Sequence, residues 1–179
     1  MMKKNLLLIF LILFFGSSLS SAELNIKSEK TGGAKMRLSS SAFSDNGMIP
    51  SRYARTGSNI SPPLAIQDIP ANAKSLALAV DDPDSPSGTW GHWVVWNIPP
   101  DTKSIPEGTQ PKGVKGRNDF GRLEWDGPSP PSGTHTYVFK IYALDILLNL
   151  KEGAGKKDME KAMEGHIFAK AVLKGKFSR

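Results

Sequence analysis

The stretch Ser75-Leu76-Ala77-Leu78-Ala79-Val80 runs directly into Asp81-Asp82-Pro83-Asp84-Ser85-Pro86. Its first half is short and apolar and is bounded by turn-forming residues, which is typical of a strand buried on both faces. Its second half contains two prolines, and a residue that precedes a proline is biased toward extended geometry. The stretch therefore predicts a core strand that ends in a stiff loop carrying Asp82 and Asp84, the kind of support that a binding site needs.

Two further runs have the composition of core strands. Residues 93–98 are mostly apolar and stop at Pro99-Pro100, and residues 137–144 are rich in aromatic and β-branched side chains. These runs and residues 75–80 predict a core sheet. The segment between them, residues 102–133, is dense in Gly, Pro, Asn and Asp and predicts long ordered loops.

The remaining elements are predicted at the two ends of the domain. Residues 36–43 alternate as an edge strand does, and residues 167–177 fit a closing strand or a continuation of a helix. One helix is predicted after the glycines at 153 and 155. The residues expected to build it are Asp158 as a cap, Met159, Ala162 and Met163 as an apolar stripe, and Gly165 as the end.

The first 22 residues have the three-part layout of a secretory signal peptide. Lys3 and Lys4 precede an apolar block at residues 6–15, and small residues lead up to Ala22. The block is short for a bilayer span, although an uncleaved anchor is the alternative. We expect a signal peptide at 1–22, a flexible lead-in at 23–35 and a single domain at 36–179. The domain is then secreted across the inner membrane, into the periplasm or further outside.

Composition limits the classes of partner. The chain has no cysteine, so its core must form without disulfides. The net charge is +6, and removal of Lys3 and Lys4 lowers it by two. The remaining positive charge is spread along the chain, so nucleic-acid binding is not predicted, whereas weak attraction to anionic membrane surfaces stays open. No segment after the first 22 residues is apolar enough for stable membrane insertion.

Two histidines adjoin the predicted strand ends. His92 follows Trp90-Gly91, and His135 lies close before Tyr137. A carboxylate beside an imidazole favours its protonated form and fixes which ring nitrogen donates, so Asp82 or Asp84 can make either histidine an oriented donor for an anion. The hydroxyl of Tyr137 adds another donor. The sequence thus predicts one polar pocket that combines both clusters.

Several alternatives stay open for these residues. The acids could be an ordinary Asp-Pro turn, and the histidines and Trp90 could be core residues. Asp82 and Asp84 could also bind an ammonium group of the ligand. A pocket of that kind would suit a zwitterionic head group better than bare phosphate. A zinc site of His92, His135 and an Asp is not predicted, because the close ligand spacings of such sites are missing. His166 is expected to be structural.

At this point several motifs, in order along the chain, resemble the phosphatidylethanolamine-binding protein family in its bacterial Raf-kinase-inhibitor-like branch. The resemblance covers about residue 36 to the carboxy terminus. The segments that carry it are 43–50 (FSDNGMIP), 59–64 (NISPPL), 82–86 (DPDSP), 91–99 (GHWVVWNIP), 116–121 (GRNDFG), 127–135 (GPSPPSGTH) and 163–166 (MEGH).

The resemblance implies an all-β fold. Two antiparallel sheets are expected to pack as a Greek-key-like β-sandwich with one or two short peripheral helices. It also implies a small anion pocket at one end of the sandwich, for phosphoryl head groups and similar anions. The ligand-binding residues expected there are Asp82, Asp84, Pro86, Trp90, His92, Pro131, His135 and Tyr137.

Two departures from the family pattern bear on this pocket. The family usually has His-Arg-Tyr where this chain has His135-Thr136-Tyr137, so a charge-assisted contact at the rim is lost. Ala54 and Ser129 stand where the bacterial branch usually has cysteines, which suits an oxidising compartment.

The resulting prediction is a secreted binding protein for a small phosphate- or carboxylate-bearing ligand, such as a phospholipid head group. In this reading His92, His135 and Tyr137 hold the ligand, Asp82 and Asp84 orient them, and no catalytic residue, cofactor or metal is required. One alternative is an inhibitor of a protease or kinase that uses the pocket rim, which implies a protein partner. Another is a phosphoester hydrolase with Asp84 or His135 as general base. A monomer and a homodimer are both left open.

Overall fold

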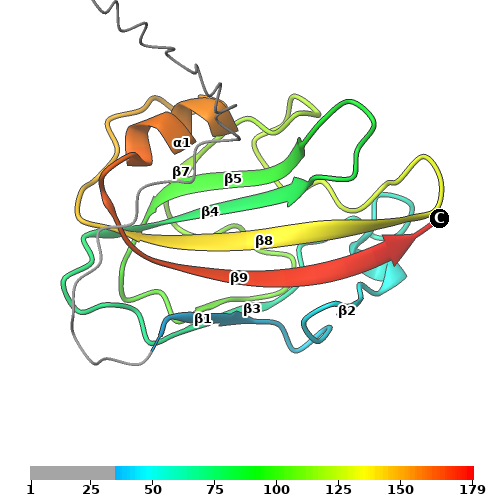
Figure 1. Ribbon diagram of the computed structural model, residues 1–179, viewed down its shortest axis with the longest axis horizontal. Helices are drawn as coiled ribbons and strands as arrows, with labels where there is room; N and C mark the ends of the chain where they lie inside the picture. The colour runs from blue at the N-terminus through cyan, green and yellow to red at the C-terminus, as the bar shows by residue number, and fades with distance from the viewer. Residues whose placement is uncertain (1–34) are drawn as a thin grey trace, which may run out of the picture.

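A computed structural model describes residues 35–179 of the chain (Figure 1). The predicted signal peptide at 1–22 and the predicted lead-in, apart from Lys35, lie outside these residues. Within them, no helix is both long and apolar enough to cross a membrane. The elements are β1 (Arg37–Ser39), β2 (Gly47–Met48), a short 3₁₀ turn η1 (Ser51–Tyr53), β3 (Leu64–Gln67), β4 (Ser75–Asp82), β5 (Trp90–Ile98), β6 (Ser104–Ile105), β7 (Val114–Lys115), β8 (Thr134–Leu144), α1 (Lys156–Met163) and β9 (Ile167–Ser178).

The larger sheet has six strands in the order β2-β9-β8-β4-β5-β7. The three predicted core strands, β4, β5 and β8, are adjacent at its centre, so this prediction is confirmed. The segment that could have continued a helix is instead the strand β9, which pairs with β8 from Thr134↔Ser178 to Leu144↔Ile167. All neighbouring strands are antiparallel except β2 and β9, which run parallel.

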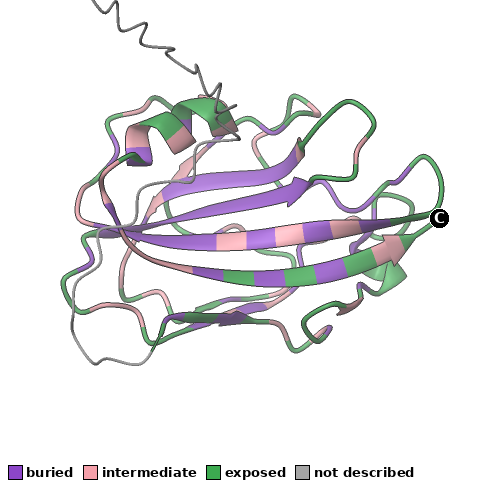
Figure 2. Ribbon diagram, viewed as in Figure 1, coloured by how far each residue is buried: buried purple, intermediate pink, exposed green. Residues whose placement is uncertain are grey.

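A smaller sheet, β1-β3-β6, packs against one face of the larger sheet (Figure 1). Leu38 and Ile66 of this sheet share a buried apolar cluster with Leu78, Val95 and Phe139 of the larger one. Exposed and buried residues alternate along much of β9, as expected for a strand with one face on the core (Figure 2). The molecule is therefore the predicted β-sandwich.

The helix α1 lies on the opposite face of the larger sheet (Figure 1). Its fully buried Met159 and Met163 belong to a second apolar cluster with Trp96 and Tyr142. The helix begins three residues earlier than predicted: Gly155 is its N-cap, and the Asp158 carboxylate reaches back to accept the Gly155 backbone N–H at 3.0 Å. Asp158 thus caps the helix from its third position, because a carboxylate there can satisfy a free N–H group.

The strand pairing brings three strand ends to one edge of the larger sheet. Since β4 is antiparallel to both β5 and β8, the end of β4 lies beside the starts of the other two strands. Asp82 pairs with Trp90, and Asp81 pairs with Val138. The two polar clusters of the sequence, which lie more than 40 residues apart, therefore meet at this edge.

Candidate anion-binding site

Asp82 and His135 form the central pair of the site. The Nδ1 atom of His135 lies 2.7 Å from the Asp82 Oδ2 atom, and both side chains are at most about a tenth exposed. The second carboxylate oxygen of Asp82 accepts the backbone N–H of Asp84 at 2.9 Å. Because an ionised carboxylate only accepts, Nδ1 of His135 is the donor and Nε2 is the ring atom left for a ligand.

Asp84 has a different role from the one predicted. Its Oδ2 atom accepts the backbone N–H of Thr136 at 2.7 Å, and it bonds to neither imidazole. The prediction that Asp84 orients a histidine is therefore wrong. Instead, Asp84 ties the loop after β4 to the start of β8 and keeps Asp82 and His135 at a fixed separation.

His92 is held by the backbone rather than by an acid. Its Nδ1 atom lies 2.6 Å from the carbonyl oxygen of Asp126, and its own carbonyl accepts the Asp126 N–H at 3.1 Å. A carbonyl only accepts, so Nδ1 carries the proton. Burial lowers the pKa of His92 despite the opposing effect of that hydrogen bond. His92 therefore presents a neutral ring whose Nε2 is an acceptor, whereas an oriented cationic donor was predicted.

The hydroxyl of Tyr137 is a buried donor that lacks a partner among the described residues. The Asp82 carboxylate and the Ser129 backbone lie close enough to act on its pKa, Asp82 by raising it and Ser129 by lowering it. Burial, and secondly the Asp82 charge, raise the pKa of Tyr137, so the hydroxyl keeps its proton. Its ring meets the His92 ring edge-on at 5.1 Å. A buried unpaired donor costs about 1–3 kcal/mol, which a ligand oxygen would recover.

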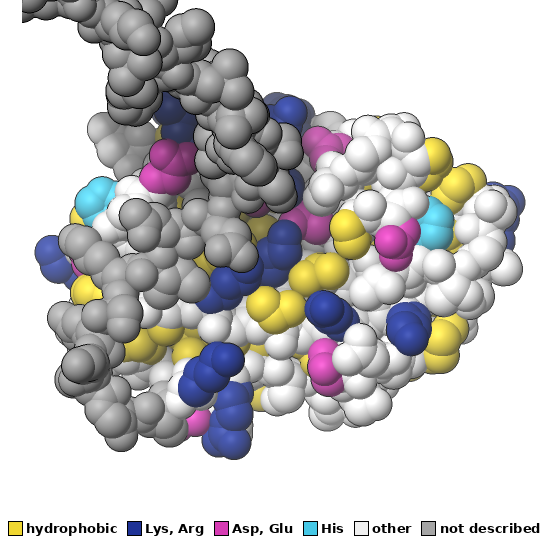
Figure 3. All heavy atoms as spheres, in the orientation of Figure 1, with side chains coloured by type: hydrophobic (Ala, Val, Ile, Leu, Met, Phe, Trp, Pro, Cys, Tyr) yellow, Lys and Arg dark blue, Asp and Glu magenta, His cyan; other side chains and the backbone are white. Residues whose placement is uncertain are grey.

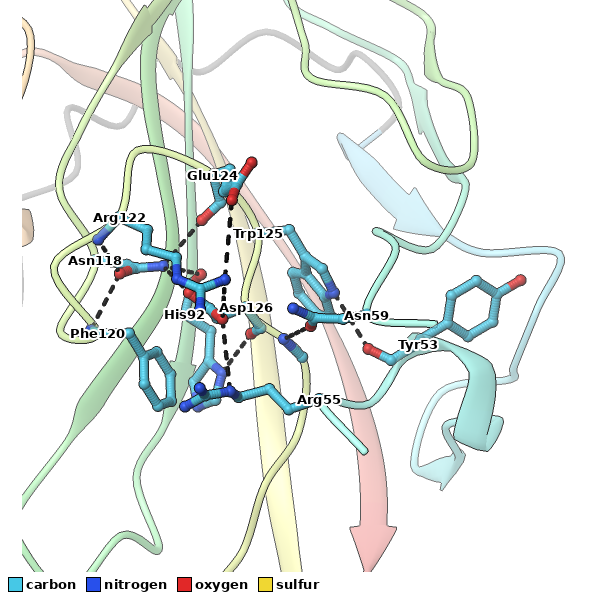
Figure 4. Close-up of polar contacts among 11 residues, drawn as sticks. Tyr53, Arg55, Asn59, His92, Asn118, Phe120, Arg122, Glu124, Trp125 and Asp126 are labelled. Carbon is cyan, nitrogen blue, oxygen red and sulfur yellow. Dashed lines mark hydrogen bonds and ion pairs between the residues drawn. The ribbon is translucent and has the colours of Figure 1, made fainter. Parts of the chain in front are cut away.

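Behind His92 lies a network that the sequence reading missed (Figure 4). The carboxylate of Asp126 is fully buried. The Asn118 side chain donates to its Oδ2 atom at 3.0 Å and to the His92 carbonyl at 3.2 Å. Arg55 and Arg122 approach its Oδ1 atom to 3.6 and 3.5 Å. In the sequence, the only sign of this network was an acid, Asp126, inside a loop rich in Gly and Pro, and its partners could not be inferred from that.

The same network places the Arg55 guanidinium close to the site. Two guanidinium groups face the Asp126 carboxylate, and Arg122 also lies 3.9 Å from the Glu124 carboxylate, so two positive charges meet two negative ones. The Arg55 guanidinium lies 4.3 Å from the centre of the Phe120 ring, a cation–π contact. The Phe120 ring in turn meets the rings of His92 and Trp90 edge-on at 5.2 and 5.5 Å. The Arg55 guanidinium therefore stands one aromatic ring away from His92 and Trp90.

The remaining predicted site residues are less closely joined to this centre. Trp90 is half-buried, and its indole N–H is a second buried donor with no partner within residues 35–179. Pro86 and Pro131 are exposed and lie in the loops that precede β5 and β8. No contact joins either proline to Asp82 or His135 in the described part of the chain, so their role in binding stays a prediction.

Other polar features lie apart from the site. In residues 35–179, His, Asp and Glu side chains form no group of three suited to a metal ion. His166 bonds to Asp145 at 2.6 Å between α1 and β9, where a structural role was expected. A hollow of about 590 Å³ along β3, lined by residues such as Arg37, Asp68 and Lys103, shares no residue with the site.

Comparison with known proteins supplies the wider context. A family profile described as phosphatidylethanolamine-binding protein matches residues 39–178. A UPF0098 protein of Methanothermobacter thermautotrophicus is 52% identical over 150 residues, which cover 80% of this chain and 99% of that protein. A UPF0098 protein of Pyrococcus horikoshii is 48% identical over 161 residues, or 83% of this chain and 81% of the relative.

Two crystal structures resemble the fold. One, from Chlamydia trachomatis, is described as a candidate phosphatidylethanolamine-binding protein homolog and has 43% identity and a TM-score of 0.78. The similarity covers 81% of this chain and 98% of that one. The other, YbcL of E. coli, is described as a member of the mammalian family and has 28% identity and a TM-score of 0.76 over 82% of this chain and 99% of its own.

Proposed function

This chain belongs to the phosphatidylethanolamine-binding protein family, and on that premise we propose that it binds a small phosphate- or carboxylate-bearing ligand at the site around Asp82 and His135. The observation that carries the proposal is the Tyr137 hydroxyl, a buried donor without an acceptor beside an oriented histidine. A ligand oxygen between Tyr137 and the Nε2 atom of His135 would satisfy both groups. The proposal includes no catalytic step.

The balance of charge indicates the class of ligand. Asp82 and Asp84 are negative, whereas the side chains of Arg55, Arg122, Asp126 and Glu124 together carry no net charge. An oxyanion at Nε2 of His135 would favour the protonated imidazole, because opposite charges stabilise each other. The protein side of the site then carries one net negative charge, which a cationic end of the ligand would offset. A group with an anionic and a cationic end, such as phosphorylethanolamine, fits this balance better than bare phosphate does.

The test is a titration with phosphate and with phosphorylethanolamine, in which NMR follows the imidazole signals of His92 and His135. We expect saturable shifts of both signals and tighter binding of phosphorylethanolamine. His135→Ala and Tyr137→Phe each remove one donor to a charged oxygen, so each is expected to weaken binding by on the order of 10- to 100-fold. Tyr137→Phe also removes the unpaired hydroxyl, so its unfolding free energy should not decrease.

The matched control is His166→Ala. His166 belongs to another Asp–His pair, the one with Asp145, between α1 and β9. Its removal should leave ligand affinity within twofold of the unsubstituted protein. If neither imidazole signal moves at millimolar ligand, or if His135→Ala binds as well as the parent, the proposed site does not bind such ligands.

A further inference from the structure

The outward face of β8 and β9 has an unusual pairing of cationic and aliphatic side chains. The pairing Thr136↔Lys176, Val138↔Lys174, Lys140↔Val172 and Tyr142↔Lys170 sets these residues side by side on one face. Met48 of β2 pairs with Lys176 and extends the face by one strand. We call this set the lysine face: Lys140, Lys170, Lys174, Lys176, Val138, Val172 and Met48.

The lysine face is open. Lys174 and Lys176 are exposed, and Val172 and Met48 are 41% and 54% exposed, which is unusual for large apolar residues on a sheet. Figure 3 shows dark-blue cationic side chains with yellow apolar ones between them across the region of β8 and β9. The helix α1 packs elsewhere on this side of the sheet, over Trp96 and Tyr142. Within residues 35–179, the part of the lysine face formed by Lys174, Lys176, Val172 and Met48 is therefore uncovered, whereas Lys140 and Lys170 are partly buried.

The positive charge of the lysine face is largely uncompensated. Lys140 bonds to the Asp81 carboxylate at 2.5 Å, and Lys156 also lies 3.3 Å from that carboxylate. Lys170, Lys174 and Lys176 form no ion pair with any described residue. Asp45, the acid beside β9, uses its carboxylate to accept the backbone N–H of Lys174 at 2.9 Å. Lys174 and Lys176 thus have no acidic side chain paired with them among the described residues, whereas Lys170 lies over the Tyr142 ring and is attracted by Asp81 and Glu160.

We propose that the lysine face docks on an anionic phospholipid bilayer. Lysines can lay their aliphatic stems along apolar surface while the ammonium groups reach lipid phosphates, and exposed aliphatic side chains can enter the headgroup region. A nucleic acid fits less well, because recognition of unpaired bases uses aromatic stacking and the exposed apolar residues here are Val172 and Met48. This docking is separate from ligand binding at His135 and does not rest on it.

The test is binding of the domain to lipid vesicles. The predicted signal peptide would itself bind lipid, so the chain used is 35–179, which contains both sheets, their buried core and the whole family match. Binding is measured on vesicles of pure phosphatidylcholine and on vesicles in which about a third of the lipid is the anionic phosphatidylglycerol. A lysine near an anionic membrane surface contributes about 1 kcal/mol, or about fivefold. Replacing Lys170, Lys174 and Lys176 by Gln should therefore weaken binding by on the order of 100-fold.

The matched control replaces Lys103, Lys112 and Lys151 by Gln. These three lysines are exposed and lie outside the lysine face, and their replacement lowers the net charge by the same amount. This variant should retain most of the binding, and His135→Ala should retain all of it, which separates docking from ligand capture. Equal loss in both triple variants would mean that net charge alone attracts the domain, and would overturn the proposal. Binding unaffected by phosphatidylglycerol, or abolished by His135→Ala, would also overturn it. Tighter binding to single-stranded DNA than to anionic vesicles would replace the lipid by a nucleic acid.

Discussion

The partner of each histidine, rather than the residue type, decides its chemistry in this protein. The Nδ1 atom of His135 donates to the Asp82 carboxylate, which leaves its Nε2 atom for a ligand. His92 donates to the uncharged carbonyl of Asp126 and is almost fully buried, so its neutral form is favoured. Two histidines that are equivalent in the sequence therefore differ in their partners: His135 is fixed by a carboxylate, whereas His92 is fixed by a carbonyl and is a neutral acceptor.

His92 should make the stability of the protein depend on pH. Its pKa is lowered from 6.5 in the folded state, so the unfolded chain binds a proton at a pH at which the folded protein does not. The unfolding free energy should thus decrease as the pH falls below about 6.5, until the folded state is also protonated. We expect His92→Asn, whose amide can replace the Nδ1–H donor, to reduce this loss of stability.

The measurement is urea unfolding of both proteins between pH 5 and pH 8. His135 and His166 are present in both, so the difference between the two curves isolates His92. If His92→Asn and the parent lose equal stability over this range, the folded state does not hold His92 neutral.

At the scale of elements, β8 links the core, the candidate site and the lysine face. Its inward side chains include Phe139 and Ile141 of the main core, its first residues provide His135 and Tyr137, and its outward side chains include Val138 and Lys140. A strand alternates its side chains between two faces, so one strand can serve all three. A shift of one residue in its register would move all of these side chains to the wrong face.

The helix α1 should contribute to stability without affecting the site. Met163 is fully buried in the cluster that contains Leu144, and Leu144 lies at the end of β8 remote from His135. Met163→Ala is expected to lower the unfolding free energy by about 2–4 kcal/mol, because it leaves a cavity. Phosphorylethanolamine affinity should remain within twofold. A loss of affinity comparable to that of His135→Ala would show that α1 and the site are coupled.

At the scale of the whole molecule, the chain joins the family fold to an amino-terminal segment that predicts export. Expression of the full chain in a Gram-negative host should yield a periplasmic protein that begins at Glu23, since small residues precede that position. Cell fractionation and amino-terminal sequencing measure this outcome. Leu8→Arg with Leu11→Arg interrupts the apolar block and should keep the chain in the cytosol. A mature protein that begins at Met1 in the cytosol of the parent strain would contradict export.

The local pattern of the sequence was enough to predict much of the fold. The core strands β4, β5 and β8 were predicted from short apolar runs bounded by turn residues, and α1 from its methionines at helical spacing. These features depend on neighbours along the chain, and hydrophobic periodicity records such neighbours. The motifs that indicated the family are likewise continuous segments, which the match over residues 39–178 confirms.

The tertiary structure decided which side chains share contacts. Periodicity does not reveal strand register, and register determined that Asp82 meets His135, that Asp84 meets the Thr136 backbone and that Lys174 lies beside Val138. The buried Asp126 network was also invisible in the sequence, because its partners come from separate loops. The sequence by itself thus determined the core strands, the helix and the family, whereas the short strands β2, β3, β6 and β7 and the hydrogen-bond partners were decided only by long-range packing, because pairing with a distant strand rather than local pattern creates them.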